Sequence, residues 1–175
     1  MILCVDHSAQ RAASWDELTR ALGGSFAARA RGVVSPELVL LTGTGYPFGR
    51  LAAGEADRTH LQAGELTAWI EPLTGGAHAM TTGDEETLIA ETAGPASALT
   101  LRSGGRTYEA SISLFRNSAT ARASDGGEAA RVSGGLTNRR YRAVFDPQDP
   151  ASLPIAVFLL HRTFALRSMA YRASP

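Results

Sequence analysis

Five arginines form the densest groups of side chains in this chain that could bind an anion. Two flank a Gly-Gly turn and three stand in the run "NRRYR": Arg102 and Arg106, then Arg139, Arg140 and Arg142. A guanidinium group carries a planar fork of N–H donors that fits a phosphate group. These five are therefore the candidate ligand-binding residues, and they form one patch if the strands that carry them are neighbours. The alternative is a solvated or ion-paired surface.

The charge is distributed unevenly along the chain. All 17 basic residues are arginine, and the formal net charge is zero. Residues 1–100 hold 6 Arg against 12 acidic residues, whereas residues 101–175 hold 11 Arg against 5. A basic C-terminal part indicates an anionic partner such as lipid headgroups, unless the two parts neutralise each other in the fold. We do not expect nucleic acid, because few aromatic residues stand between the arginines.

Residues typical of metal sites and of covalent catalysis are sparse. Cys4 and His7 form a single C-x-x-H pair, while His60, His78 and His161 are scattered, and a zinc site needs three or four convergent ligands. No G-x-S-x-G motif is present. We therefore expect no metal, no cofactor and no enzymatic activity. An enzyme whose pocket is invisible in the sequence remains an alternative.

Two other polar motifs are better interpreted as turns. The stretch "GTGYPFG" (43–49) does not have the G-x-G-x-x-G spacing, and no amphipathic helix follows it. The acidic cluster 84–86 stands beside Gly83, and we expect a solvated hairpin tip there, because paired catalytic carboxylates must converge in a cleft.

The first 24 residues are expected to form a separate helical segment. "ILCV" (2–5) is typical of a short strand. A helix is predicted to follow in "SWDELTRALGG", with Ser14 and Glu17 at capping-box spacing and glycines after its last turn. Its apolar side carries Trp15, Leu18 and Leu22. A regulatory adaptor that contacts a protein partner through these three residues is the alternative function.

From Ser25 to about Asp146 the pattern is one of short strands and turns. In "SALTLRSGGRTYEASISL" (97–114), apolar and polar residues alternate on both sides of a Gly-Gly pair, which predicts a β-hairpin. "TARASDGGEAARVSGG" (120–135) predicts a second hairpin, and "RRYRAVF" (139–145) one further strand. Many closely spaced strands indicate an antiparallel barrel or sandwich.

The stretch "SLPIAVFLLHR" (152–162) is predicted to be a helix that is buried on all sides. Residues 155–160 are all apolar, so a helix through them has no polar side, and the run is too short to span a membrane. Ser152 is placed to cap it and Pro154 falls in its first turn. The simplest place for such a helix is the inside of a closed barrel. A central strand is the alternative.

The run "YRAVFDPQDPASLPIAVFLLHR" (141–162), which follows this series of strands, resembles the C-terminal end of tubby-like barrels. That superfamily includes the tubby C-terminal domain, the plant LURP-one-related proteins and the phospholipid scramblases. The resemblance covers about residues 25–172 in architecture and 141–161 in residue types. It implies a mainly β fold: a closed antiparallel β-barrel of twelve strands that encloses a hydrophobic C-terminal helix, as one domain (25–175) after the N-terminal segment (1–24).

The resemblance also implies a function. Tubby domains bind phosphoinositide headgroups through basic residues on the barrel exterior, which makes the five arginines candidate contacts for an anionic membrane surface. This chain departs from the family at His161-Arg162, where an acidic residue is common. Asp146 and Asp149 stand where scramblases have a proposed calcium loop, but "DPQD" offers too few oxygen ligands. We expect a non-enzymatic, bacterial module that binds anionic lipid headgroups or another phosphate-bearing ligand, cytoplasmic and peripheral at the membrane; its oligomeric state is left open.

Overall fold

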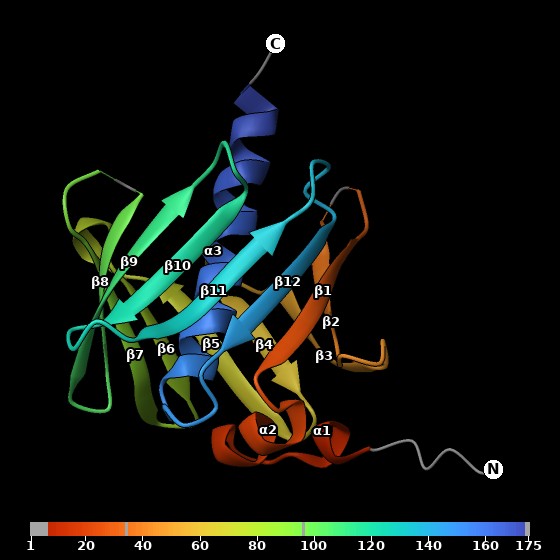
Figure 1. Cartoon of the computed structure of the whole chain (residues 1–175). Helices are drawn as coiled ribbons and strands as arrows, with labels where there is room; N and C mark the ends of the chain where they lie inside the picture. The colour runs from red at the N-terminus through yellow and green to blue at the C-terminus, as the bar shows by residue number, and fades with distance from the viewer. Residues whose placement is uncertain (1–6, 34, 96, 174–175) are drawn as a thin grey trace.

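Twelve antiparallel strands form a closed barrel in the computed structural model, which describes residues 7–33, 35–95 and 97–173 (Figure 1). Each strand pairs with the next, and the last closes onto the first. The strands are β1 (Ser25–Arg31), β2 (Glu37–Leu41), β3 (Pro47–Ala53), β4 (Thr59–Ala63), β5 (Leu66–Pro72), β6 (His78–Thr82), β7 (Glu85–Thr92), β8 (Ala98–Ser103), β9 (Arg106–Ser113), β10 (Ser118–Ala123), β11 (Glu128–Gly134) and β12 (Arg140–Phe145). Cys4 and the strand expected at residues 2–5 lie outside the described residues.

The alternation of side chains determines which face of each strand is buried. In β12, Tyr141, Ala143 and Phe145 are buried, while the residues between them are exposed. Both predicted hairpins are confirmed, as β8–β9 and β10–β11. At the first, Gly104 and Gly105 have φ of +57° and +76°, which a two-residue turn with both φ values positive requires and which glycine adopts without strain.

Helix α3 (Ser152–Ala173) runs through the barrel, as the sequence predicts. Leu153 and the six apolar residues 155–160 are each at most 1% exposed. This part of the helix therefore forms the centre of the barrel's hydrophobic core. The predicted cap is wrong. Ser152 is the first helical residue, and its hydroxyl donates to the carbonyl oxygens of Asp146 and Asp149, whereas the Asp149 carboxylate accepts from the Ala151 N–H.

Two short helices, α1 (Ser8–Arg11) and α2 (Trp15–Leu22), cover the end of the barrel where α3 begins (Figure 1). Ser14 accepts from Glu17 N–H as predicted, but the Glu17 carboxylate accepts from Ala13 N–H instead of closing the capping box on Ser14. The Trp15 indole donates to Thr82 Oγ1 over 2.9 Å. We call this the capped end.

At the opposite end, which we call the exit end, α3 leaves the barrel. The segments that connect strands there are 32–36, 54–58, 73–77, which includes the 3-10 turn η1 (Thr74–Gly76), 93–97, 114–117 and 135–139. Within the described residues, no helix combines the length and apolarity that crossing a membrane needs.

Candidate anion-binding surface

The two predicted arginines of the β8–β9 hairpin are both ion-paired. On β8, Arg102 Nη2 lies 2.9 Å from the Glu91 carboxylate of the neighbouring strand β7. At the start of β9, Arg106 contacts two carboxylates, Asp125 at 3.3 Å and Asp149 at 3.1 Å. Their positive charge is therefore compensated within the chain, as expected of an ion-paired surface.

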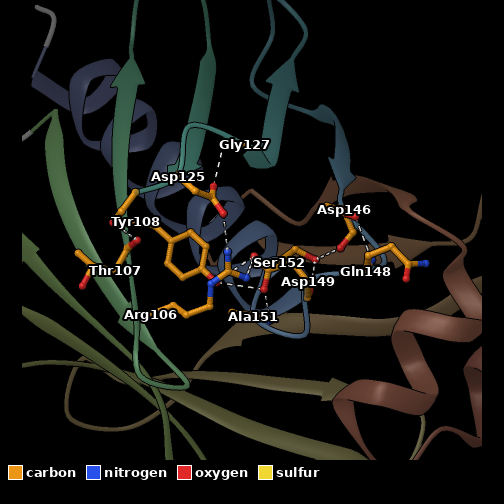
Figure 2. Close-up of polar contacts among 11 residues, drawn as sticks. Arg106, Thr107, Tyr108, Asp125, Gly127, Asp146, Gln148, Asp149, Ala151 and Ser152 are labelled. Carbon is orange, nitrogen blue, oxygen red and sulfur yellow. Dashed lines mark hydrogen bonds and ion pairs between the residues drawn. The ribbon is translucent and has the colours of Figure 1, made fainter.

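Figure 2 shows that Arg106 belongs to a network around a buried carboxylate at the capped end. The Tyr108 hydroxyl lies 3.0 and 2.9 Å from the two oxygens of Asp149, whose side chain is only 7% exposed. The Arg106 guanidinium lies against the Tyr108 ring, 5.5 Å from its centre. Burial, and then the bond to Asp149, raise the pKa of Tyr108 to about 12.

This network anchors the start of α3 to the wall of the barrel. Asp149 accepts from Tyr108, from Arg106 and from the Ala151 N–H, so its two oxygens are already engaged. A carboxylate with these partners has little capacity left for a metal or a substrate. Asp149 thus holds the segment before α3 in place. A cavity of about 150 Å³ adjoins it and is lined in part by Trp15 and Pro154.

The other predicted arginines lie elsewhere on the barrel. Arg140 and Arg142 point outward from β12, which is separated from β9 by β10 and β11. Arg139 precedes β12 and is exposed, and its carbonyl oxygen accepts from Ala30 N–H of β1. The condition for one continuous patch of five arginines is not met. Whether any of them binds an anion stays a prediction.

The barrel closes by pairing of β12 with β1, and this brings β12 next to arginines from the N-terminal part of the chain. Arg140 stands directly opposite Arg29 of β1, Arg29 opposite Val39 of β2, and Val39 opposite Arg50 of β3. Residues directly opposite on neighbouring strands have Cβ atoms about 5 Å apart and share a face. Three arginines therefore lie in one row across four strands.

We call Arg29, Arg50, Arg140 and Arg142 the basic face. All four are exposed, and none has an ion pair within the described residues. Val39, on the same outer surface, is only 8% exposed. Arginine stems commonly cover apolar surface in this way while their charged ends stay in water. The face thus presents several uncompensated guanidinium groups on a rigid sheet.

Other arginines on the barrel wall contrast with the basic face. Arg58 pairs with Glu71 at 2.9 Å and Arg131 with Glu128 at 2.6 Å, in addition to the pairs of Arg102 and Arg106. A groove of about 370 Å³ adjoins the basic face near the capped end, between Arg31, Arg50, Gln10, Glu37 and Gln62. Four arginines of the chain thus have a carboxylate partner, whereas the four of the basic face have none among the described residues.

Neither Arg29 nor Arg50 stands in a dense group of arginines, so the sequence pattern does not select them. The alternation in "SFAARAR" does place Arg29 and Arg31 on one side of a strand, which was the available signal. Their position in one row with Arg140 of β12 depends on the closure of the barrel, which pairs β1 with a strand far away in the sequence.

A second polar group lies on α3 towards the exit end. His161 Nε2 lies 3.0 Å from Thr59 Oγ1, and Arg162 Nη1 lies 3.2 Å from His78 Nε2. Within the described residues, His161 Nδ1 and Arg162 Nε are buried without a hydrogen-bond partner. Burial and the nearby Arg162 charge lower the pKa of His78 to about 4 and that of His161 to about 3. Both imidazoles are therefore neutral at pH 7.

The other residues considered on sequence grounds for metal or phosphate binding lie in strands and turns and form no common site in the described part of the chain. His60 stacks on Trp69 with ring centres 4.4 Å apart, on the outside of β4 and β5. The first part of the "GTGYPFG" segment (43–46) forms the β2–β3 turn, whereas Pro47 is already the first residue of β3; Gly83-Asp84 form the exposed β6–β7 turn. Within the described residues, no three His, Cys, Asp or Glu side chains gather as metal ligands would.

The apolar side of α2 faces the barrel. Leu18 is 1% exposed, and Trp15 and Leu22 pack partly buried against the same core. These side chains thus close the capped end, and a contact with a protein partner through them stays a prediction.

Comparison of the chain with models of protein families, with curated proteins and with solved structures finds no match. The structure itself shows a closed twelve-stranded antiparallel barrel with a C-terminal helix inside it.

Proposed function

We propose that this protein is a non-enzymatic module that docks on membranes by binding anionic phospholipid headgroups with its basic face. The observation that carries the proposal is the row of Arg140, Arg29 and Arg50, with Arg142 beside it, exposed and without ion pairs in the described part of the chain. Like charges directly opposite each other destabilise a sheet. An anionic surface would neutralise them together.

The expected strength follows from the number of arginines. A basic residue near an anionic membrane contributes about 1 kcal/mol, so four contribute about 4 kcal/mol. Since 1.4 kcal/mol is a factor of ten, binding to anionic vesicles should exceed binding to neutral ones by about a thousandfold at low salt. The attraction should weaken with salt, because exposed charges are screened over about 10 Å at 0.1 M.

We also propose that the barrel is a tubby-like barrel. Twelve antiparallel strands in sequential order around a buried C-terminal helix agree with that resemblance. Headgroup binding on the barrel exterior is the function that such a relationship implies, with a protein located in the cytoplasm and peripheral at the membrane.

The test is co-flotation of the purified protein with vesicles of phosphatidylcholine alone and of phosphatidylcholine with phosphatidylserine, at low and high salt. We expect flotation only with the phosphatidylserine vesicles, and less of it at high salt. Equal flotation with both vesicle types, or none with either, would contradict the proposal.

A further inference from the structure

Exposed apolar side chains gather at the exit end of the barrel. Among the described residues, nine large hydrophobic side chains are exposed, and six of them lie on the connecting segments of this end or on the protruding part of α3: Val33, Leu73, Leu114, Phe115, Leu136 and Met169. Scattered exposed apolar residues are normal, but a cluster of them marks an interaction surface.

The most exposed of the six are at the tips of two adjacent hairpins. Phe115, in the β9–β10 turn, is 97% exposed, and Leu136, in the β11–β12 segment, is 93% exposed. Strands β10 and β11 are paired, and Figure 1 shows both tips beside the emerging helix. Neither side chain contributes to the core, so the fold does not explain why they are apolar.

These tips are held in place by polar contacts. The Asn117 side chain donates to Gly135 O over 2.7 Å, which joins the first turn to the second. From α3, Arg167 donates to Leu114 O over 2.8 Å and to Leu136 O over 3.1 Å. Because the backbone is held in this way, presenting Phe115 and Leu136 to a partner costs little further ordering.

The charges around the tips select the kind of partner. Segments 32–36, 114–117 and 135–139 contain Arg116 and Arg139 and no acidic residue, whereas segment 54–58, across the exit end from 114–117, contains Glu55, Asp57 and Arg58 and so carries a net negative charge. Apolar tips flanked by arginines fit the anionic surface and apolar interior of a bilayer. Arg29 and Arg140 of the basic face stand near the same end of β1 and β12.

We propose that Phe115 and Leu136 insert into the anionic bilayer on which the basic face docks, so that the barrel lies tilted with its β9–β12 tips in the membrane. This inference rests on the proposed function and adds the orientation and the apolar contact. The basic face supplies attraction to the headgroups, and the two tips supply contact with acyl chains.

The test uses Phe115→Trp in the full chain, with the unsubstituted protein as background for its two native tryptophans. Added phosphatidylcholine–phosphatidylserine vesicles should shift the emission of the new indole to shorter wavelength, and brominated lipids should quench it. In flotation, Phe115→Ser and Leu136→Ser should each weaken binding about tenfold, since each removes most of one apolar side chain that inserts into the bilayer. Tyr46→Ser, an exposed residue at the capped end, is the matched control and should bind as the unsubstituted protein does.

The outcomes separate this inference from the proposed function. If the unsubstituted protein floats with anionic vesicles but the new indole is neither shifted nor quenched and both serine variants bind normally, docking holds and insertion is wrong. If nothing floats, both are wrong. A blue-shifted indole without vesicles, together with dimers in sedimentation velocity, would assign the tips to a second copy of the chain and would also overturn insertion.

Discussion

Arg29 of β1 stands directly opposite Arg140 of β12, at the seam where the barrel closes. Two like charges in this position should cost the fold about 0.5 kcal/mol. We expect Arg29→Thr to raise the melting temperature by about 1–2 °C at low salt, since about 1 kcal/mol corresponds to 2–4 °C in a chain of this size. Differential scanning calorimetry at low and high salt measures this, and the gain should shrink as salt screens the pair.

Arg102→Thr is the matched control for that pair, because Arg102 faces the carboxylate of Glu91 instead of another arginine. It should leave the melting temperature unchanged or lower it slightly. A decrease for Arg29→Thr as large as that for Arg102→Thr would show that the two arginines do not repel each other.

The bonds of Asp149 should make it a strong contributor to stability. Asp149→Asn removes the charge that faces Arg106 and weakens the bonds to Tyr108 and Ala151. We expect a loss of about 2 kcal/mol in the free energy of unfolding, measured by urea denaturation. Asp125→Asn is the control, since Asp125 is exposed and also contacts Arg106, and it should cost less than about 0.5 kcal/mol. Equal effects would mean that burial of Asp149 is not what matters.

Stability should fall as the pH drops below about 6.5, because of the buried His161. Its pKa is lowered to about 3 by burial and by nearby Arg162 and His78, whereas in the unfolded chain it is the ordinary 6.5. Below 6.5 the unfolded state gains a proton that the folded state does not, so stability present above that pH is lost on acidification. Between pH 7.5 and pH 5 His161 should account for about 2 kcal/mol.

His161→Gln cannot titrate, so its stability should change less over the same pH range than that of the unsubstituted protein. The free energy of unfolding, measured at pH 7.5, 6.5, 5.5 and 5 for both proteins, gives the comparison. Identical pH profiles would contradict the buried, neutral state of this histidine.

Helix α2 should be part of the folding unit, because its apolar side closes the barrel. Leu18→Ala should cost about 3 kcal/mol, as expected for a leucine that is 1% exposed. Arg20→Ser, on the exposed side of the same helix, should change stability little. If Leu18→Ala left stability unchanged, the helix would be free to serve as the contact of an adaptor.

The sequence predicts elements that depend on neighbouring residues better than contacts between residues that are far apart in the chain. The run 155–160 is apolar on every side, and only a fully enclosing fold can bury such a helix, so its place in the barrel followed from composition alone. The β8–β9 turn followed from two adjacent glycines. In contrast, the sequence indicates no role for Asp149 beyond the rejected calcium site, because nothing local relates it to Tyr108, which lies 41 residues earlier.

The basic face can be predicted only in part, because its arginines come from parts of the sequence that are far apart. Arg140 and Arg142 were selected for their density in the sequence. Their neighbours Arg29 and Arg50 come from the acidic half of the chain, and only the closure of β12 onto β1 brings them together. The charge imbalance between the two parts of the sequence therefore does not describe the charge of the folded surface.

The most direct test of the central claim compares two triple variants that lower the net charge equally. One is Arg29→Ser, Arg140→Ser and Arg142→Ser on the basic face; the other is Arg20→Ser, Arg58→Ser and Arg102→Ser, located away from that face. Their affinities for phosphatidylcholine–phosphatidylserine vesicles are measured at one low salt concentration, after circular dichroism has shown both folded. We expect the first to bind about a hundredfold more weakly than the unsubstituted protein, at about 1 kcal/mol per arginine, and the second within a few-fold of it. Equal losses in the two variants would show that net charge, and not this face, determines binding.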